Sequence, residues 1–280
     1  MNPLRRTPNS RKAVAAFLQS RMARGLSART LEWYAYALSP LTTTNRLPRK
    51  PAELEALLAQ VQGSPSTRHA FWRALTIFYR WAHSRLGVPD AAADLPPPKQ
   101  PHRLPPSLSH HQVDQLLALR TPRRNRAILT LFLDTGLRLG ELASLTWPHI
   151  GTETITVDGK TGQRQVPVSP ETLRLLIGLG GPEAVWTCPA RAGHPLTRNS
   201  IQRMTRRALR RIGVRGGPHL LRHTFARLYV TAGGDVFSLQ RILGHTEITM
   251  TRRYADLDMR DIAAQHQQFS PIARRAAGVE

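Results

Sequence analysis

The chain has 280 residues and a net charge of +22, from 40 basic and 18 acidic side chains, so a polyanion such as nucleic acid is its expected partner. The length allows two domains with a sizeable core, and no apolar run reaches the roughly 20 residues that a membrane span needs. A single cysteine, Cys188, excludes an internal disulfide and a cysteine-built zinc site, and the basic N-terminus lacks the apolar core of a secretion signal, so the composition favours the cytoplasm.

Residues 1–95 predict a small helical domain. Apolar residues at helical spacing indicate helices over 10–24, 27–38, 51–61 and 66–86, with short loops between them. We expect the aromatic side chains of this domain in its core rather than on a surface that stacks bases. The helix over 66–86 is a candidate for contact with a DNA groove or backbone, through Arg73 and Arg80.

A proline-rich stretch divides the chain. Seven prolines between residues 88 and 106 predict a semi-rigid, extended linker, which we bound at 96–106. Residues 1–95 hold 14 basic and 5 acidic side chains, and residues 96–280 hold 26 and 13. Two basic domains, 1–95 and 107–280, could therefore grip a duplex from opposite sides.

The second domain is predicted to be mainly helical, with one small antiparallel β-sheet. Ser109 opens a capping box, and a helix rich in Leu and Ile follows over 122–135. Alternating residues over 153–157 and 164–168 predict two strands, joined by a hairpin turn at 158–162. Further helices are predicted from 170, over 197–212, from His219, over 235–243 and near Tyr254, before a helix and loose tail over 258–280.

Lysine is rare in this arginine-rich chain, occurring only at positions 12, 50, 99 and 160. Arginine keeps its proton near neutral pH, whereas the pKa of lysine can be tuned until it releases one. Lys160 lies at the predicted hairpin turn, where its long side chain can extend towards a ligand. It is therefore a candidate proton donor.

The last third of the chain carries a set of polar residues suited to a phosphate. His219 and Arg222 lie one helical turn apart, behind Pro218 at a helix N-terminus that favours anions. His245 follows a glycine turn, and Tyr254 lies nine residues further on. Arginines can fork onto phosphate oxygens, a tyrosine can attack as a nucleophile, and a lysine or histidine can protonate the departing alkoxide. This chemistry requires no metal.

These motifs occur together in a known order. Thr-Gly-Leu-Arg-x-x-Glu-Leu from Thr135, the hairpin Gly-Lys, His-x-x-Arg-His-Thr-Phe, Leu-Gly-His and the final tyrosine resemble the tyrosine recombinase (phage integrase) family across 135–254. The helical domain at 1–95 resembles that family's core-binding domain. The chain is most similar to the compact Xer-like or mobile-element members, and we expect no additional N-terminal arm-binding domain.

The resemblance implies a site-specific DNA recombinase that works through a 3′-phosphotyrosyl intermediate, without ATP, metal or other cofactor. It assigns Arg138 and Arg222 to the scissile phosphate, Lys160 to protonating the 5′ leaving oxygen, His219 to exchanging a proton with the tyrosine, His245 to a hydrogen bond with the phosphate, Tyr254 to the covalent link, and Glu141 to orienting Arg138.

The resemblance also implies partners. Strand exchange between two DNA duplexes requires four protomers, so a homotetramer is expected in the synaptic complex; a second recombinase or an accessory protein is left open. The tail beyond Tyr254, with Ile262, Phe269 and Ile272, is expected to dock into a neighbouring protomer. The strongly basic helix over 197–212 is a second candidate for DNA contact, through Arg198, Arg203, Arg206 and Arg207.

Two other functions remain to be weighed. A type IB topoisomerase shares this chemistry but relaxes DNA without strand exchange, and the compact first domain argues against it. A non-catalytic DNA-binding regulator would have no need for Tyr254. Each candidate residue alone has an ordinary structural interpretation, and only the ordered set points to catalysis. His223 is expected to point into the fold, and His110, His111 and His149 to face solvent or cap helices.

Overall fold

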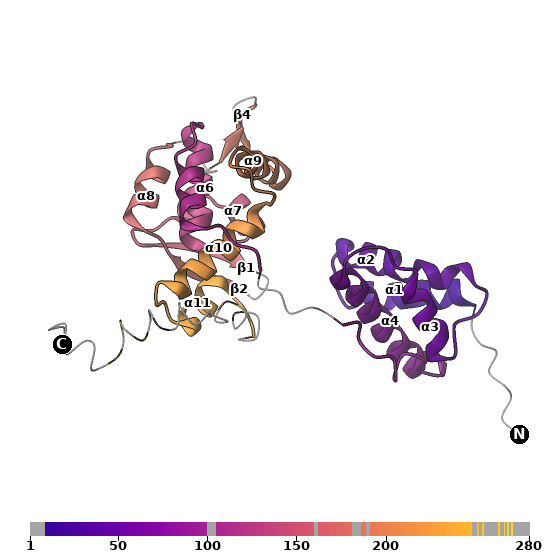
Figure 1. Cartoon of the computed structure of the whole chain (residues 1–280). Coiled ribbons are helices and arrows are strands. Elements are labelled where there is room, and N and C mark those ends of the chain that lie inside the picture. The colour runs from indigo at the N-terminus through magenta and orange to yellow at the C-terminus, as the bar shows by residue number, and fades with distance from the viewer. Residues whose placement is uncertain are drawn as a thin grey trace, which may run out of the picture. The chain divides into compact units, whose positions relative to one another are not determined.

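The structure, a computed structural model, divides into two units, Met1–Arg103 and Leu104–Glu280 (Figure 1). It describes residues 9–99, 105–159, 162–180, 186–188 and 191–247, together with Thr251, Tyr254, Ala263, His266, Gln268 and Ser270. Helices dominate, accompanied by short antiparallel strand pairs. The predicted fold class, mainly helical with a small antiparallel sheet, is confirmed.

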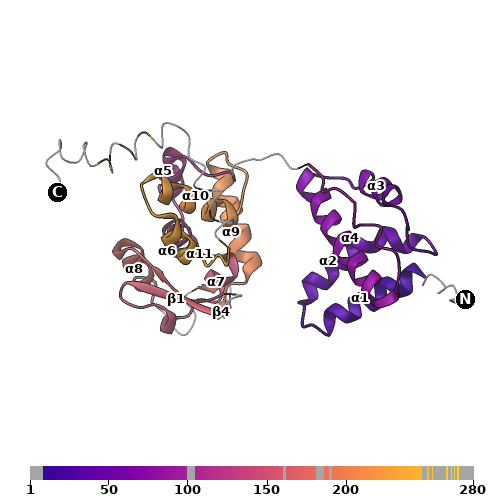
Figure 2. The ribbon, with the colours of Figure 1, turned by 90° about the horizontal axis from the view of Figure 1, so that it is seen from below.

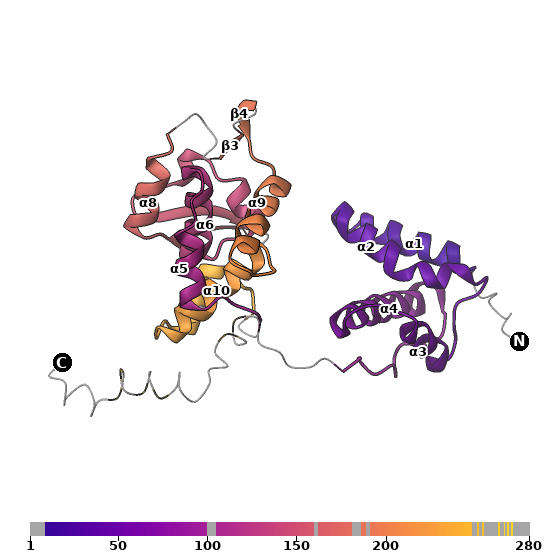
Figure 3. The ribbon, with the colours of Figure 1, turned by 45° about the horizontal axis from the view of Figure 1, so that its top comes forward.

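The first unit consists of α1 (Ser10–Met22), α2 (Ala28–Leu38), a 3-10 turn (Ser39–Thr43), α3 (Pro51–Ala59) and α4 (Pro65–Leu86). In Figure 3, α1 and α2 form one layer and α3 and α4 form the other. Between the layers, the ring of Phe17 makes edge-to-face contacts with Tyr34, Phe78 and Trp81 at 5.3–5.4 Å between centroids. The prediction that the aromatic residues form the core is confirmed for Phe17, Phe78 and Tyr79, which are fully buried, but Tyr36 is 63% exposed.

The beginning of the proline-rich stretch differs from the extended linker that its composition indicated. Val88, Ala91, Ala92 and Leu95 are buried in the core of the first unit, and Leu95 accepts a hydrogen bond of 2.9 Å from the Trp72 indole. Burial of these apolar side chains outweighs the preference of the prolines for an extended chain. Only residues beyond this point remain as the expected linker.

The second unit contains α5 (His110–Leu117), α6 (Arg123–Thr135), α7 (Leu139–Ala143), a 3-10 turn (Trp147–His149), α8 (Pro170–Ile177), α9 (Arg198–Arg211), α10 (Pro218–Thr231) and α11 (Val236–Leu243). Helix α6 is central and packs against α8 and α10 (Figures 1 and 3). Its Ile128, Leu131 and Phe132 are fully buried. The predicted capping box is present at Ser109, where helix α5 begins.

The hairpin of the second unit pairs β1 (Thr154–Gly159) with β2 (Gly162–Pro167). The strands extend into the turn predicted over 158–162, because Asp158 pairs with Gln163 and Gly159 pairs with Gly162. Figure 2 shows β1 beside α7. A second pair, β3 (Thr187–Cys188) and β4 (Arg191–Pro195), was not predicted from the sequence.

No helix in the described ranges is both long and apolar enough to span a lipid bilayer.

Candidate active site

Two glycine turns bring three helix ends together. Gly136 follows α6 with φ +61°, and Gly244 follows α11 with φ +63°, a conformation that favours glycine. The first turn leads into Arg138 at the start of α7, and the second leads into His245. Both turns meet α10 at Arg222, which donates to the carbonyl oxygens of Gly136, 86 positions earlier, and of Leu243, 21 positions later.

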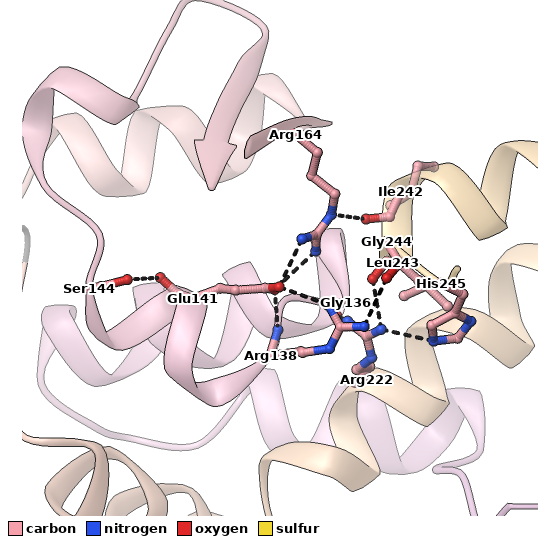
Figure 4. A network of polar contacts seen from close by, with 10 residues as sticks. All are labelled: Gly136, Arg138, Glu141, Ser144, Arg164, Arg222, Ile242, Leu243, Gly244 and His245. Atoms are coloured by element: carbon pink, nitrogen blue, oxygen red, sulfur yellow. Dashed lines mark hydrogen bonds and ion pairs between the residues drawn. The ribbon is translucent and has the colours of Figure 1, made fainter. Parts of the chain in front are cut away.

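Arg222 is buried, with 4% of the residue exposed. Its guanidinium donates to the carbonyl oxygens of Gly136 at 2.6 Å and Leu243 at 2.9 Å, and to Nε2 of His245 at 3.0 Å (Figure 4). Burial, with a contribution from the Arg138 charge, lowers the pKa of Arg222 to about 10. It therefore stays cationic at neutral pH, as a preorganised positive charge in a poorly hydrated site.

Arg138 is more accessible, with 36% of its side chain exposed. Its guanidinium donates to Oε1 of Glu141 at 2.9 Å and to the carbonyl oxygen of Gly244 at 3.0 Å. It lines an open hollow of ≈ 450 Å³ that is also lined by Gly159 and Arg198. An exposed, fixed guanidinium in such a hollow can fork onto a phosphate from solution.

Glu141 holds this arrangement together. Its carboxylate is 4% exposed and accepts bonds from the main-chain N–H and the guanidinium of Arg138 and from both terminal nitrogens of Arg164. Burial raises the pKa of Glu141, but the hydrogen bonds from Arg164 and Arg138 outweigh it and leave the pKa below its ordinary value. Glu141 is thus ionised at neutral pH. The contact with Arg138 agrees with the orienting role that the resemblance assigned.

Arg164 is a site residue that the sequence reasoning missed. It lies on β2, and its Nε donates to the carbonyl oxygen of Ile242 at 3.0 Å while its other two nitrogens bind Glu141 (Figure 4). Its side chain also lies against Gly244, where an added Cβ would stand 2.9 Å from Nε. The available signal was the alternation along the strand: Arg164 lies two residues before the buried Val166 and so shares its inward face.

His219 is exposed in the first turn of α10, next to the two arginines. Although the residue is exposed, nearby protein atoms partly remove its imidazole from water, and this desolvation, together with the positive charges of Arg222 and Arg138, lowers its pKa below the ordinary value. The imidazole is accordingly neutral at physiological pH. A neutral imidazole at this position can donate to, or accept from, a group bound by the arginines.

His245 and Tyr254 are also brought to this site. Because an arginine only donates, Nε2 of His245 accepts from Arg222 and its Nδ1 carries the proton, 2.7 Å from Oγ1 of Thr251. Tyr254 is 5% exposed, and its hydroxyl lies 2.6 Å from Nδ1 of His223. His223, expected to point into the fold rather than at DNA, is half-buried and contacts the hydroxyl of the buried candidate nucleophile.

The remaining candidates fall at different places. Lys160 lies outside the described residues, as do Ile262, Phe269 and Ile272 of the tail. Arg73 and Arg80 on α4, and Arg198, Arg203, Arg206 and Arg207 on α9, are exposed. His110 and His111 are exposed in the first turn of α5, and His149 closes a turn with Thr146 at 2.8 Å. Within the described part of the chain, no three His, Cys, Asp or Glu side chains gather as a metal site requires.

Sequence relatives align with most of the length of the chain. The phage integrase family matches residues 106–261. Tyrosine recombinase XerC of Xanthomonas campestris pv. campestris (strain B100) is 33% identical over 236 residues, which cover 78% of this chain and 72% of the relative. Tyrosine recombinase XerC of Xylella fastidiosa (strain 9a5c) is 31% identical over 287 residues, covering 94% of this chain and 97% of the relative.

Solved structures share the fold. A lambda integrase dimer bound to a COC′ core site aligns with a TM-score of 0.72 at 22% identity, covering 86% of this chain and 97% of that chain. XerH site-specific recombinase bound to a palindromic difH substrate aligns with a TM-score of 0.72 at 19% identity, covering 88% and 82%. With the sequence matches, this places the chain in the phage integrase family, the tyrosine-type site-specific DNA recombinases.

Proposed function

We propose that this protein cuts double-stranded DNA at specific sites through a 3′-phosphotyrosyl link to Tyr254 and rejoins the ends to a partner strand. One observation carries the proposal. The Tyr254 hydroxyl is held against α10 by His223, the residue that follows Arg222, so a buried nucleophile lies beside a buried cation. A phosphate bound there would have its negative charge balanced while it is attacked.

The side chains divide the work as follows. Arg138 binds the phosphate from the open hollow that it lines, and the buried Arg222 provides a fixed positive charge. His219 and His245 hydrogen-bond the phosphate oxygens, which requires His245 to present a protonated Nε2 in place of its contact with Arg222. Lys160 protonates the 5′ oxygen as it departs, a role that rests on the family motif alone. The guanidinium charges supply the stabilisation, so we expect cleavage without metal or ATP.

We further propose that the first unit and α9 both bind the duplex. Four protomers would assemble for strand exchange, in the cytoplasm, where the DNA lies. The related lambda integrase has been solved as a tetramer bound to a Holliday junction.

The tail beyond Tyr254 would dock into a neighbouring protomer. Deleting residues 262–280 should then abolish synapsis while a single half-site is still bound, and unimpaired recombination by the truncated protein would refute the docking role.

Covalent trapping on sheared DNA from the source genome tests the function. The protein is incubated with DNA without metal, denatured with detergent, and the protein-linked fragments are sequenced, with Tyr254→Phe in parallel. We expect one inverted-repeat sequence to be enriched by the wild-type protein and lost with Tyr254→Phe.

Other outcomes would favour the alternatives. Enrichment of scattered sequences, with relaxation of supercoiled plasmid, would indicate a type IB topoisomerase-like enzyme. Retention of specific fragments only without detergent, and equally by Tyr254→Phe, would indicate a DNA-binding regulator.

A further inference from the structure

The segment that carries the nucleophile is fixed to α10 at two points. Oγ1 of Thr251 contacts His245, which in turn contacts Arg222. Three residues later, the Tyr254 hydroxyl contacts His223, and the Tyr254 N–H donates to the Thr251 carbonyl at 2.9 Å. Because Arg222 and His223 are consecutive, these contacts close into a ring that sets where the hydroxyl can lie.

The contact between His223 and Tyr254 is short and well defined. The hydroxyl oxygen and Nδ1 are 2.6 Å apart, and the two ring centroids are separated by 5.7 Å at an interplanar angle of 43°. The phenol ring packs in a small apolar cluster with Ala226, Val230, Leu239 and Leu243. With its ring held in this way, Tyr254 directs its hydroxyl at Nδ1 of His223, a nitrogen that can take a proton when the imidazole is neutral and carries its hydrogen on Nε2.

We propose that His223 accepts the proton of Tyr254 as the hydroxyl attacks the phosphate, and returns it when the strand is rejoined. The proposal rests on the recombinase function proposed above and adds a residue that the ordered motif set did not assign. A phenol has an ordinary pKa of about 10 and imidazole one of about 6.5. A neutral imidazole within hydrogen-bond distance is thus a suitable general base near neutral pH.

The step balances without a co-reactant. The Tyr254 oxygen forms a bond to phosphorus while its proton moves to Nδ1 of His223. The bond from phosphorus to the 5′ oxygen breaks, and its electron pair stays on that oxygen, which takes a proton from the general acid. The phosphate remains a diester throughout. Rejoining reverses each transfer, so His223 then acts as the acid towards the tyrosine.

The proposal separates two histidines that lie one helical turn apart. His219 and His223 are four residues apart on α10, so they share a face. His219 is exposed, and partial desolvation of its imidazole, with the charges of Arg222 and Arg138, favours its neutral form, which suits a donor to the phosphate. His223 is half-buried and contacts the reacting atom itself. Proton exchange with the tyrosine is thereby reassigned from His219 to His223.

Cleavage of a suicide substrate tests the assignment. The substrate is a nicked duplex that contains the half-site recovered by covalent trapping. The single-turnover rate of adduct formation is measured for wild type, for His223→Ala and His223→Asn, and for the exposed control His111→Ala. Asparagine can place a polar atom near the position of Nδ1 but cannot take a proton. We expect both His223 variants to lose about 100-fold or more in rate, with half-site affinity kept within about twofold and the control at the wild-type rate.

Three results would overturn the proposal. A wild-type rate for His223→Ala would remove any role in the reaction. A wild-type rate for His223→Asn would show that the contact only positions the hydroxyl. Faster cleavage by both variants would show that it restrains the tyrosine. Should His223→Ala fail to fold in a thermal melt, His223→Asn carries the comparison.

A more acidic nucleophile gives a second measurement that loss of structure cannot imitate. Replacing Tyr254 with 3,5-difluorotyrosine lowers the pKa of the phenol and so reduces the need for a base. The rate lost on His223→Ala or His223→Asn should then shrink at least tenfold. An equal loss with either phenol would overturn the proposal. Absence of any adduct from the wild-type protein would instead count against the recombinase function.

Discussion

Arg164 on β2 forks onto both carboxylate oxygens of Glu141, at 2.8 and 2.9 Å. The same guanidinium binds the carbonyl oxygen of Ile242 at the end of α11. Glu141 in turn holds Arg138. One side chain from the hairpin therefore connects the helix end that carries Arg138 with the helix end that leads to His245. The relative placement of two phosphate-binding candidates depends on a residue that need not touch the phosphate.

Arg164→Met is expected to slow cleavage much more than it weakens DNA binding. Without the two bonds from Arg164, Glu141 keeps only its contacts with Arg138, and neither side chain is then held in place. We expect this loss of positioning to slow cleavage by about 100-fold. Removing one partner from a buried ion pair should also lower the free energy of unfolding by about 3 kcal/mol. Arg164→Lys should rescue little, since an ammonium cannot span both carboxylate oxygens and the Ile242 carbonyl. Single-turnover cleavage and half-site affinity measure the two effects.

The chain offers a matched control for this prediction. Arg174 contacts Glu171 at the same distance of 2.8 Å, but both side chains are at least 70% exposed. Exposed pairs contribute little to stability, so Arg174→Met should leave cleavage, affinity and unfolding unchanged. If Arg164→Met behaved like Arg174→Met, the Arg164–Glu141 fork would have no part in assembling the site.

Glu141→Gln should remove a pH-dependent part of the stability. The folded-state pKa of Glu141 lies below its ordinary value of 4.5, so its contribution is present above that pH and is lost as the pH falls through the folded-state pKa. The variant should therefore melt at a lower temperature than wild type at pH 7, and the difference should narrow below about pH 4.5. Glu171→Gln, at the exposed pair, should show no such trend. A constant difference from pH 7 to pH 4 would contradict the prediction.

Local signals were strong enough to predict most helices and the ordered motif. Ser27, Ser64 and Ser109 each accept a main-chain bond at a helix N-terminus as such residues do, and Gly87 and Gly244 end helices in the left-handed conformation. Such features depend on neighbours within a few residues, which the sequence displays directly.

What the sequence did not predict depends on contacts between distant segments. Arg164 matters because residues 23 positions before it and 78 after it lie around it, and His223 because Tyr254 arrives from 31 positions away. His223 has no local pattern that distinguishes it from another histidine, and the place of Arg164 on the inward face of its strand, two residues before buried Val166, does not reveal its partners. Residues 88–95, which we placed in the first domain although they begin the proline-rich stretch, are buried because α4 and its neighbours supply the core around them.

Affinity for DNA should fall steeply with salt, because each neutralised phosphate releases counterions. The slope of log affinity against log salt is expected to be about −0.9 per phosphate contact between about 50 and 300 mM salt. Helix α9 buries Ile201 and Leu209 and exposes Arg206 and Arg207. Arg206→Gln and Arg207→Gln should each flatten the slope by about 0.9 if each contacts one phosphate. Arg174→Gln is the control, and a flat salt dependence of the wild-type protein would argue against DNA binding.

Gly136→Ala should damage the site from a position that carries no side chain. The residue has φ +61°, and an added Cβ would clash with the Phe225 ring and stand 2.8 Å from a methyl of Leu243. The Gly136 carbonyl also accepts the 2.6 Å bond from Arg222. The substitution therefore combines backbone strain, a clash in the packing of α10 against α11, and displacement of an acceptor that holds a catalytic candidate.

Gly213→Ala separates these effects. Gly213 has a similar φ of +73°, but nothing lies within 4 Å of an added Cβ. The control should lose only the cost of strain, about 1–2 kcal/mol, and keep the wild-type cleavage rate. Gly136→Ala should lose more, about 3 kcal/mol in urea unfolding with overpacking included, and its cleavage rate should fall at temperatures where it is still fully folded. If both variants lost the same stability and cleaved normally, the Gly136 turn would be able to move without displacing Arg222. Among its described contacts, Leu243 and His245 would then be sufficient to position Arg222.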